Sequence, residues 1–405
     1  CDVYAYGDDG YDNSAGYMIY GEIPSFKIYD SSEGEYFDVF PSDPTQYYPF
    51  GSNTSVETID ELIFELSYSL PLHEHSNLIS FYVLPEDIAT PSVMNDIEDN
   101  IIAVLGASNS AMYSGDYWAG SLLEIDISSG YWLRMADADT LDGSGYPLNP
   151  GRIYNLHSGA NLVSFPSTGS VNISAGLPDD IEDNVIAVLG EGYSAVNTDD
   201  GWEGSLLNFE ALHGYWMITD DDISFSYELD EQEFLSRNSN PYKTAEKPLG
   251  FDFIQSTQQA FYFVDNIELL EGEIEEGDWL ISYCGSVVTG TRQWLGSTVD
   301  IPVMGAEGTL MTGGYCETND TPHFKLLKSG SHELISLHAE TPEWQSNGIF
   351  FLSSLRESTP IPNEFSMEAA YPNPFNPMTQ IGFKIPSESH VEISIFDLRG
   401  QKVST

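Results

Sequence analysis

The sequence has few basic residues. Lys and Arg together number 13, against 64 Asp and Glu, and the formal net charge at pH 7 is −51. Nucleic-acid binding requires clustered Lys and Arg that neutralise phosphates, and anionic membrane surfaces attract basic segments for the same reason. The composition therefore argues against both as partners. The acidity is explained either by a solvated surface adapted to salt water or by binding of divalent cations.

Long apolar runs, metal-binding cysteine spacings and catalytic motifs are also missing. No run of about 18 apolar residues occurs, so no segment is predicted to span a bilayer. The three cysteines show no CxxC spacing; Cys284 could pair with Cys316, but the sequence leaves the pairing open. No GxSxG, HExxH, P-loop or dinucleotide-binding fingerprint is present. We therefore expect a protein that is not an enzyme.

What the sequence does contain is internal repeats. DIEDNIIAVLG at 96–106 recurs as DIEDNVIAVLG at 180–190, an offset of 84 residues. The same offset, without a gap, relates Asn-Leu-Ile-Ser-Phe to Asn-Leu-Val-Ser-Phe and one Gly-Tyr-Trp to another. We call these two units the B repeats. A match of this length indicates a modular array.

A second internal match joins the N-terminus to a later part of the chain. Residues 2–27 match 300–325 at an offset of 298 residues, with shared Gly, Tyr, Pro and Phe-Lys positions. The later copy has an upstream half, 251–294, that the first copy lacks. We call the later copy the complete A module and the first copy the N-terminal half-module. Because Cys1 opens in the middle of this pattern, we expect a longer mature protein.

Both module types are predicted to be β. Their apolar and aromatic runs, such as NLISF and GYWLRM, are short and separated by Gly, Asn, Asp, Ser and Pro. We predict an all-β fold of tandem sandwich-like or barrel-like modules, with a short helical turn before each DIEDN. The predicted domains are the N-terminal half-module (1–50), the first B repeat (62–141), the second B repeat (152–228), the complete A module (249–357) and a C-terminal segment (369–405).

The C-terminal segment carries a specific motif. YPNPFNP at 371–377 is followed by Ile-Gly-Phe at 381–383 and by VEISIFD at 391–397. This pattern closely resembles the type A C-terminal sorting domain of the type IX secretion system. The resemblance implies an immunoglobulin-like sandwich, incomplete here because the sequence stops at Thr405, and export by the type IX machinery to the outer cell surface or beyond. The A and B units resemble repeats of large surface proteins of marine bacteria, which implies location and architecture but no chemistry.

Acidic loops supply the candidate metal ligands. Ca²⁺ binds carboxylate oxygens at short spacing, although the loop with Asp137, Asp139 and Asp142 lacks the bidentate Glu of an EF-hand. His73 and His75 are a weaker metal pair on a predicted strand, because the second B repeat has Gly159 in place of the latter. The predicted calcium ligands are Asp8, Asp9, Asp12, Asp137, Asp139 and Asp142, with the alternative that such runs arise by chance in so acidic a chain.

Two repeated features leave alternatives open. Trp118 and Trp202, each before Gly-Ser-Leu-Leu, are candidates for stacking on sugar rings, and the alternative is core packing. For the repeated Asp-Ile-Glu-Asp-Asn we predict turn and capping hydrogen bonds from Asp96, Asp99 and Asn100, with a ligand site as the alternative.

The predicted function is that of a non-enzymatic, secreted or cell-surface protein of modules in series. It would be structural or adhesive, for example a filament or surface-layer component. Its predicted partners are further copies of itself, assembled head to tail because open sheet edges at the incomplete ends can accept strands, or an extracellular polysaccharide. The alternative is a set of polysaccharide-binding accessory modules of a larger secreted hydrolase.

Overall fold

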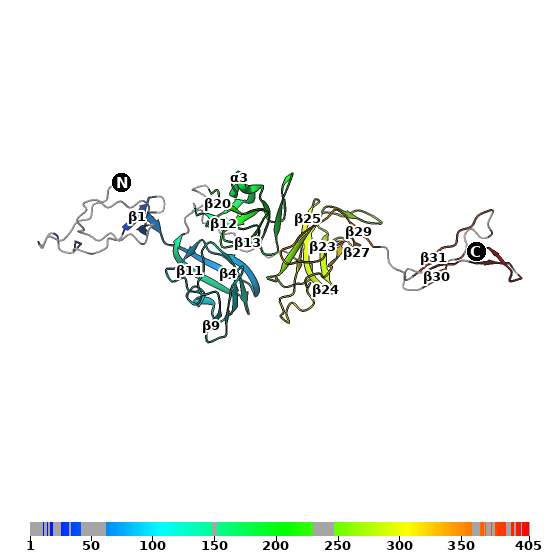
Figure 1. Ribbon diagram of the computed structural model, residues 1–405, viewed down its shortest axis with the longest axis horizontal. Coiled ribbons are helices and arrows are strands. Elements are labelled where there is room, and N and C mark those ends of the chain that lie inside the picture. Colours follow the sequence, from blue (N-terminus) through cyan, green and yellow to red (C-terminus); the bar gives the residue numbers. More distant parts are fainter. Residues whose placement is uncertain are drawn as a thin grey trace.

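The computed structural model describes residues 62–147, 152–229 and 247–358 continuously, together with parts of 11–41 and 365–404. β-Strands dominate these residues and the helices are single turns, which confirms the all-β prediction. Figure 1 shows three β units packed together, with strand segments β1 and β30–β31 lying towards opposite ends of the molecule. No helix in the described stretches has the length and apolarity needed to cross a membrane. We keep the names first B repeat, second B repeat and complete A module for the three continuous stretches.

The first B repeat is a sandwich of two sheets. Its five-stranded sheet has the order β5-β10-β7-β8-β9 and faces a three-stranded sheet, β4-β11-β6. Strand β4 alternates buried and exposed residues, so Tyr68, Leu70 and Leu72 enter the core between the sheets. The elements are β3 Leu62–Phe64, β4 Leu66–Leu72, β5 His75–Ser80, β6 Val83–Leu84, α1 Thr90–Val93, the 3-10 turn η1 Asn95–Ile97, β7 Ile101–Leu105, β8 Ser110–Tyr113, β9 Trp118–Gly120, β10 Gly130–Met135 and β11 Asp139–Pro147.

The second B repeat has the same main sheet. Its order, β13-β19-β15-β16-β17, places each strand where the first B repeat has its equivalent. The core is aromatic, with Phe165, Phe209 and Tyr227 in mutual ring contact. The elements are β12 Tyr154–Leu156, β13 Gly159–Val163, β14 Ser170–Asn172, α2 Ile173–Gly176, α3 Asp179–Glu182, β15 Val185–Leu189, β16 Ser194–Thr198, β17 Gly201–Gly204, β18 Asn208–Glu210, β19 Tyr215–Thr219 and β20 Ile223–Phe225.

The complete A module pairs a three-stranded sheet, β25-β21-β28, with a six-stranded one, β22-β29-β27-β26-β23-β24. A disulfide between Cys284 and Cys316, with Cα atoms 5.3 Å apart, ties the end of β23 to the segment before β26 and settles the pairing that the sequence left open. The strands are β21 Gln259–Val264, β22 Ile267–Glu268, β23 Trp279–Cys284, β24 Val287–Gln293, β25 Val299–Met304, β26 His323–Leu327, β27 Leu334–His338, β28 Ile349–Leu352 and β29 Leu355–Glu357.

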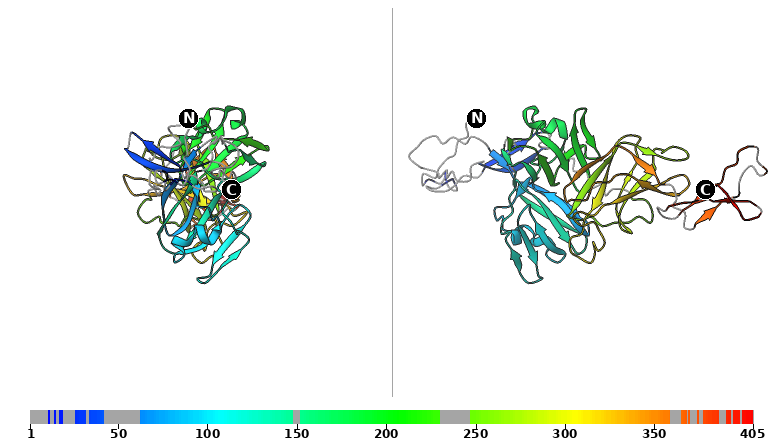
Figure 2. Two further views of the ribbon diagram at one scale, coloured as in Figure 1. Left: turned by 90° about the vertical axis from the view of Figure 1, so that its left-hand side faces the viewer. Right: turned by 45° about the vertical axis from the view of Figure 1, so that its right-hand side comes forward.

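Short strands occupy the two ends of the chain (Figure 2). At the N-terminal end β1 (Phe26–Asp30), β2 (Glu35–Pro41) and β3 form a small antiparallel sheet. At the C-terminal end β30 (Ser366–Met367) pairs with β31 (Phe383–Lys384), and β32 (Ile395–Phe396) pairs with β33 (Lys402–Ser404).

The two B repeats contact each other through equivalent residues. The backbone N–H of Ser80 donates to Leu212 O (2.9 Å), and that of Ser164 donates to Ser128 O (3.1 Å). These are the same contact with the two repeats exchanged. At the offset of 84 residues, Ser164 is the equivalent of Ser80 and Leu212 is the equivalent of Ser128. Two isolated antiparallel bridges repeat the exchange, Ile79 with His213 and Ser129 with Val163. The repeats therefore associate like a two-fold symmetric dimer within one chain.

The Gly-Tyr-Trp triplets serve this interface. A Cβ on Gly130 would lie 2.9 Å from Val163 O, and one on Gly214 would lie 2.5 Å from Ile79 O, so only glycine permits this approach. The Trp of each triplet packs in an apolar cluster that draws on both repeats: Leu78, Leu105, Trp132, Leu162 and Trp216. The repeated Trp thus joins two modules, whereas the Tyr of each triplet fills the core of its own module.

Candidate functional site

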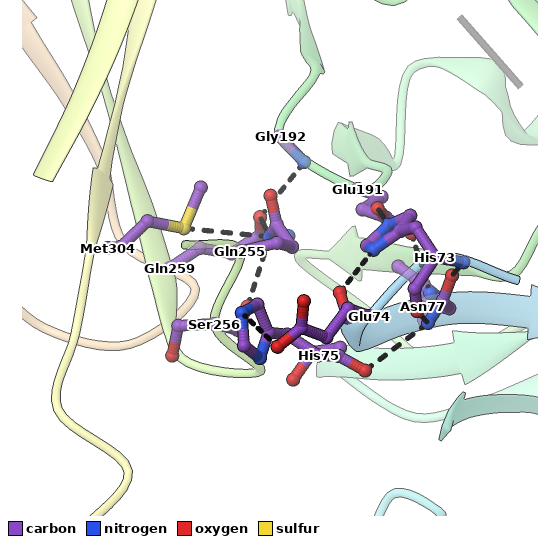
Figure 3. A network of polar contacts seen from close by, with 12 residues as sticks. His73, Glu74, His75, Asn77, Glu191, Gly192, Gln255, Ser256, Gln259 and Met304 are labelled. Carbon is purple, nitrogen blue, oxygen red and sulfur yellow. Dashed lines mark hydrogen bonds and ion pairs between the residues drawn. The ribbon is translucent and has the colours of Figure 1, made fainter. Parts of the chain in front are cut away.

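A cavity of about 600 Å³ lies where the three modules meet. Cavities between domains are common places for ligands, so this junction is the candidate functional site. Polar side chains from both B repeats and the complete A module converge on it (Figure 3). Its titratable lining residues are His73, Glu74, His75, Glu191, Tyr193, Glu210, His213, Tyr215 and Lys247.

His73 lies in a turn and not on a strand as predicted, since β4 ends at Leu72 and β5 begins at His75. Asn77 closes the turn: its Oδ1 accepts from the His73 N–H (2.9 Å) and its Nδ2 donates to His73 O (2.8 Å). Asn161 makes the same two bonds to His157 in the second B repeat, at 3.0 and 2.7 Å. The repeated Asn of the Asn-Leu-x-Ser-Phe motif therefore fixes where these histidines stand.

The His73 side chain links the two B repeats. Its Nε2 lies 2.5 Å from Glu191 Oε1 of the second B repeat, and its Nδ1 lies 2.7 Å from Glu74 O. The other Glu191 oxygen accepts from the Leu78 N–H at 2.8 Å. Burial lowers the pKa of His73, but the hydrogen bond and charge of Glu191 outweigh it, so the net pKa stands above its usual value. The imidazole therefore remains cationic to higher pH and joins the repeats as an ion pair.

The complete A module contacts the loop of residues 190–192 in the second B repeat, which also contains Glu191. The buried Gln259 donates from Nε2 to Gly190 O (2.7 Å) and accepts at Oε1 from the Gly192 N–H (3.1 Å). Gln255 Nε2 in turn donates to Gln259 Oε1 at 3.1 Å. Residues 190–192 are thus fixed by Glu191 towards the first B repeat and by Gln259 towards the complete A module (Figure 3).

A buried carboxylate fastens the complete A module to the second B repeat. Asp300, 1% exposed, accepts at Oδ2 from the Ser194 N–H (3.0 Å), Ser194 Oγ (2.7 Å) and Ser205 Oγ (2.7 Å). Arg292 donates from Nε to Asp300 O and from a terminal nitrogen to Gly192 O, both at 2.7 Å. A buried charge with this many partners fixes one relative position of the two modules.

The first B repeat is joined to the complete A module by charge. Arg134 on β10 forms an ion pair with Glu307, whose side chain is almost fully buried. Glu307 also accepts from Ser256 Oγ at 3.1 Å and from the Thr257 N–H. All three modules are therefore connected pairwise by buried or half-buried polar groups.

An apolar contact completes the junction. Strand β21 is buried on both faces: Ala260, Tyr262 and Val264 enter the core of the complete A module, and Phe261 and Phe263 point the other way. The two phenylalanines pack on Ala187, Leu189 and Val196 of the second B repeat. This double burial accounts for the continuous apolar run of β21.

Among the described residues, the predicted calcium ligands do not lie together in one site. Asp139 accepts from Asn100 Nδ2 (2.9 Å) and from the Thr140 N–H (2.8 Å), Asp137 is exposed in the preceding bend, and Asp142 lines a separate hollow. Within the described ranges no group of three His, Cys, Asp or Glu is placed to hold a metal ion. The remaining candidates, Asp8, Asp9 and Asp12, lie outside the described residues. Calcium binding stays a prediction.

The two candidate sugar-binding tryptophans are partly buried at equivalent places. Trp118 Nε1 donates to Glu98 Oε1 (3.2 Å) and Trp202 Nε1 to Glu182 Oε1 (2.6 Å). The Glu of the Asp-Ile-Glu-Asp-Asn motif makes this contact, a role that the predicted capping by the Asp and Asn residues of the motif does not include. The shared offset of 84 for both Trp and Glu was the available signal. Sugar stacking by these rings stays a prediction.

Comparison with protein families identifies the C-terminal end. Residues 369–405 match the family model for a secretion system C-terminal sorting domain. The tail is a type IX sorting domain. It directs the protein, through the type IX machinery, to the cell surface or the extracellular space. No curated protein and no solved structure matches the chain.

A tight turn joins the two strands of the described C-terminal hairpin. Gly400 adopts a φ of +79°, and its N–H donates to Asp397 O at 3.0 Å. Asp397 Oδ1 also accepts from the N–H groups of Arg399 (2.8 Å) and Gln401 (2.9 Å). The strands beside this turn, β32 and β33, expose Ile395, Phe396 and Val403 to solvent.

Proposed function

We propose that this exported protein is a non-enzymatic structural component of the cell surface, in which three modules form one rigid unit. The observation that supports this most strongly is the contact of the buried Asp300. This residue belongs to the complete A module, but its Oδ2 accepts hydrogen bonds from Ser194 and Ser205 of the second B repeat. Domains joined only by linkers move relative to one another unless their interface is large or apolar. Here charge, hydrogen bonds and packed phenylalanines all oppose such motion.

The polar side chains of the junction support this function rather than catalysis. His73, Glu191, Gln259 and Asp300 each spend side-chain atoms on a neighbouring module. A catalytic group needs a lone pair or proton directed at a substrate. Groups committed to backbone and side-chain partners in other modules serve cohesion instead.

Calorimetry and scattering test the rigid unit. We expect the three modules to unfold in one cooperative transition, and we expect small-angle scattering to fit a single compact body with the terminal segments extending from it. Three separate transitions, or a scattering profile of modules that reorient freely, would contradict the proposal.

Native mass decides whether the unit also polymerises. We would measure it by light scattering and electron imaging, first with calcium and then with chelator. Long particles that disperse on chelation would support a filament braced by calcium. A monomer indifferent to calcium would restrict the role to a rigid spacer in a larger surface protein.

A second candidate function is adhesion to extracellular polysaccharide. It is favoured by the partly exposed rings of Trp118 and Trp202 at equivalent positions of both B repeats. A glycan array should then show binding that falls at least about tenfold in the double variant W118A/W202A. Absence of binding by the unsubstituted protein would leave only the structural role.

A further inference from the structure

We propose that a hollow in the first B repeat binds a primary ammonium group, such as that of a lysine side chain or an amino sugar. The hollow has a volume of about 440 Å³ and lies between β11 and the turns α1 and η1. Its lining includes Tyr68, Asp96 and Asp142, and we call it the β11 hollow. The inference depends neither on the rigid unit nor on sugar stacking by the two tryptophans.

The Tyr68 hydroxyl reaches this hollow from the core. The side chain is 7% exposed, and its ring contacts Phe81 and Tyr82. A Cβ on Gly143 would lie 2.4 Å from the Tyr68 hydroxyl oxygen, so the hydroxyl reaches the backbone of β11 at a position without a side chain. Within the described residues this hydroxyl has no hydrogen-bond partner, although a buried Tyr hydroxyl usually has one. Its hydrogen-bonding capacity is therefore available to a ligand.

The second B repeat makes the same aromatic contact from the other strand. Tyr68 lies on β4 and packs on Phe81, whereas Tyr227 follows β20 and packs on Phe165, the equivalent of Phe81. The Tyr227 hydroxyl donates to Ser164 O at 3.1 Å. A Tyr ring thus fills this place in both repeats, but among the described residues only the Tyr of the second has a protein partner for its hydroxyl.

A backbone contact closes the corresponding space in the second B repeat. The Glu228 N–H donates to Gly176 O at 3.0 Å, so the segment after β20 lies against α2. The equivalents of these two residues are Ser144 and Ser92, which line the β11 hollow, and no described backbone hydrogen bond joins them. Strand β11 instead continues until it pairs with β6. The hollow is therefore a feature of the first repeat and not of the shared fold.

Two carboxylates line the β11 hollow beside the hydroxyl. Asp96 lies on η1 and Asp142 on β11, and neither forms an ion pair with a described residue. Asp96 accepts one long hydrogen bond, from Asn95 Nδ2 at 3.4 Å. Burial raises the pKa of Tyr68, and Tyr82 and the charges of Asp96 and Asp142 raise it further, so the phenol stays neutral. The hollow thus combines two negative charges with one neutral hydroxyl.

This combination matches an ammonium group. An ammonium has three N–H donors and no acceptor, and the two carboxylates and the Tyr68 oxygen supply three acceptors. Ca²⁺ takes roughly six to eight oxygen ligands, and no three acidic or His side chains of the described residues are grouped to hold a metal ion. A neutral sugar would offer no charge to the two carboxylates in a protein of net charge −51.

Calorimetric titration of the full chain tests the ligand class. The first probe is Nα-acetyl-lysine methylamide, whose ammonium is its one charge, in about 0.15 M salt so that the general attraction of an acidic surface is screened. We expect saturable binding, and the same probe acetylated at Nε should bind at least about tenfold more weakly. Glucosamine distinguishes the source: tighter binding than the lysine probe identifies an amino sugar, and weaker binding a lysine side chain. Equal binding of the charged and acetylated lysine probes, or no binding of either amine, would overturn the proposal.

Single substitutions test the place. Y68F removes the hydroxyl alone and should weaken binding of the preferred amine at least about tenfold, while the thermal midpoint stays unchanged because the described fold uses no hydrogen bond from it. D96N should weaken binding similarly. The matched control is D180N, which removes the equivalent charge from the second B repeat, where the space is closed, and affinity should change less than about twofold. Full affinity in Y68F, or equal losses in D96N and D180N, would show that the amine binds the acidic surface in general and would refute the site.

Discussion

The two B repeats have the same main sheet but meet the complete A module in different ways. In the second B repeat the outer face of this sheet carries Val196, 2% exposed beneath Phe261 and Phe263. The equivalent of Val196 in the first B repeat is Met112, which is 58% exposed. The equivalent of Ile218 is Arg134, which forms the ion pair with Glu307. The outer face of this sheet therefore docks through apolar packing in the second B repeat and through an ion pair in the first.

The difference shows which parts of a repeat are set by its own fold. Contacts inside each repeat are duplicated: the Tyr131 hydroxyl accepts from the Asp126 N–H and the Tyr215 hydroxyl from the Glu210 N–H, both at 2.7 Å. Contacts to the complete A module are not duplicated. The substituted positions Val196/Met112 and Ile218/Arg134 therefore distinguish how the two repeats dock, whereas the recurring Gly-Tyr-Trp residues maintain each repeat and join it to the other.

The largest expected effect on stability is a difference between equivalent substitutions on the outer faces of the two main sheets. V196D should destabilise the protein by about 5 kcal/mol, because it buries an unpaired carboxylate under Phe261 and Phe263. M112D, at the equivalent position, should change the free energy of unfolding by less than about 0.5 kcal/mol because the side chain already faces water. Chemical denaturation of both variants measures the contrast.

Scattering adds a structural control to this pair. V196D should also increase the radius of gyration as the complete A module separates, whereas M112D should leave it unchanged. Similar losses of stability in both variants would mean that the outer faces are equivalent in solution and that the described docking does not persist.

Removal of Asp300 should have the next largest effect. D300A leaves Arg292 buried without its carboxylate and removes the acceptor of Ser194 and Ser205, so we expect a loss of about 3 kcal/mol. The exposed Glu271 provides the control, and E271A should fall within about 0.5 kcal/mol of the unsubstituted protein. Equal stability of D300A would show that the modules hold together without this contact.

The sequence predicted the modules better than their junction. Apolar alternation and repeated turns indicate strands because these patterns act over a few residues. YPNPFNP indicates the sorting domain by its resemblance to that family. The contact between His73 and Glu191 joins residues 118 positions apart on different modules. Nothing local marks it, since Glu191 has Ala107 as its counterpart in the first B repeat. Interfaces depend on which surfaces meet, and a pattern within one module does not encode that.

The tryptophan–glutamate contacts should give a smaller effect that differs between the repeats. W202F should cost about 2 kcal/mol, since its indole donates to the Glu182 carboxylate at 2.6 Å. W118F should cost about 1 kcal/mol because the equivalent bond to Glu98 is longer, at 3.2 Å. Denaturation of the two single variants measures the ranking, and a greater loss in W118F would contradict it.

The smallest expected effect is on the pH dependence of thermal stability, and it should also differ between equivalent positions of the two repeats. Because the folded pKa of His73 is raised, its ion pair with Glu191 contributes fully below the unfolded pKa of about 6.5 and is lost as pH rises through the folded value. The thermal midpoint should therefore fall as pH rises from about 6 to 8.

H73N should reduce the slope of the thermal midpoint against pH. H157N, at the equivalent turn, should leave it unchanged, because the residue equivalent to Glu191 is Ala107, which carries no carboxylate. An unchanged slope in H73N would show that the imidazole is not charged in the folded junction, and the two repeats would then be joined by the backbone bridges, the shared tryptophan cluster and uncharged hydrogen bonds such as that from the Leu78 N–H to Glu191.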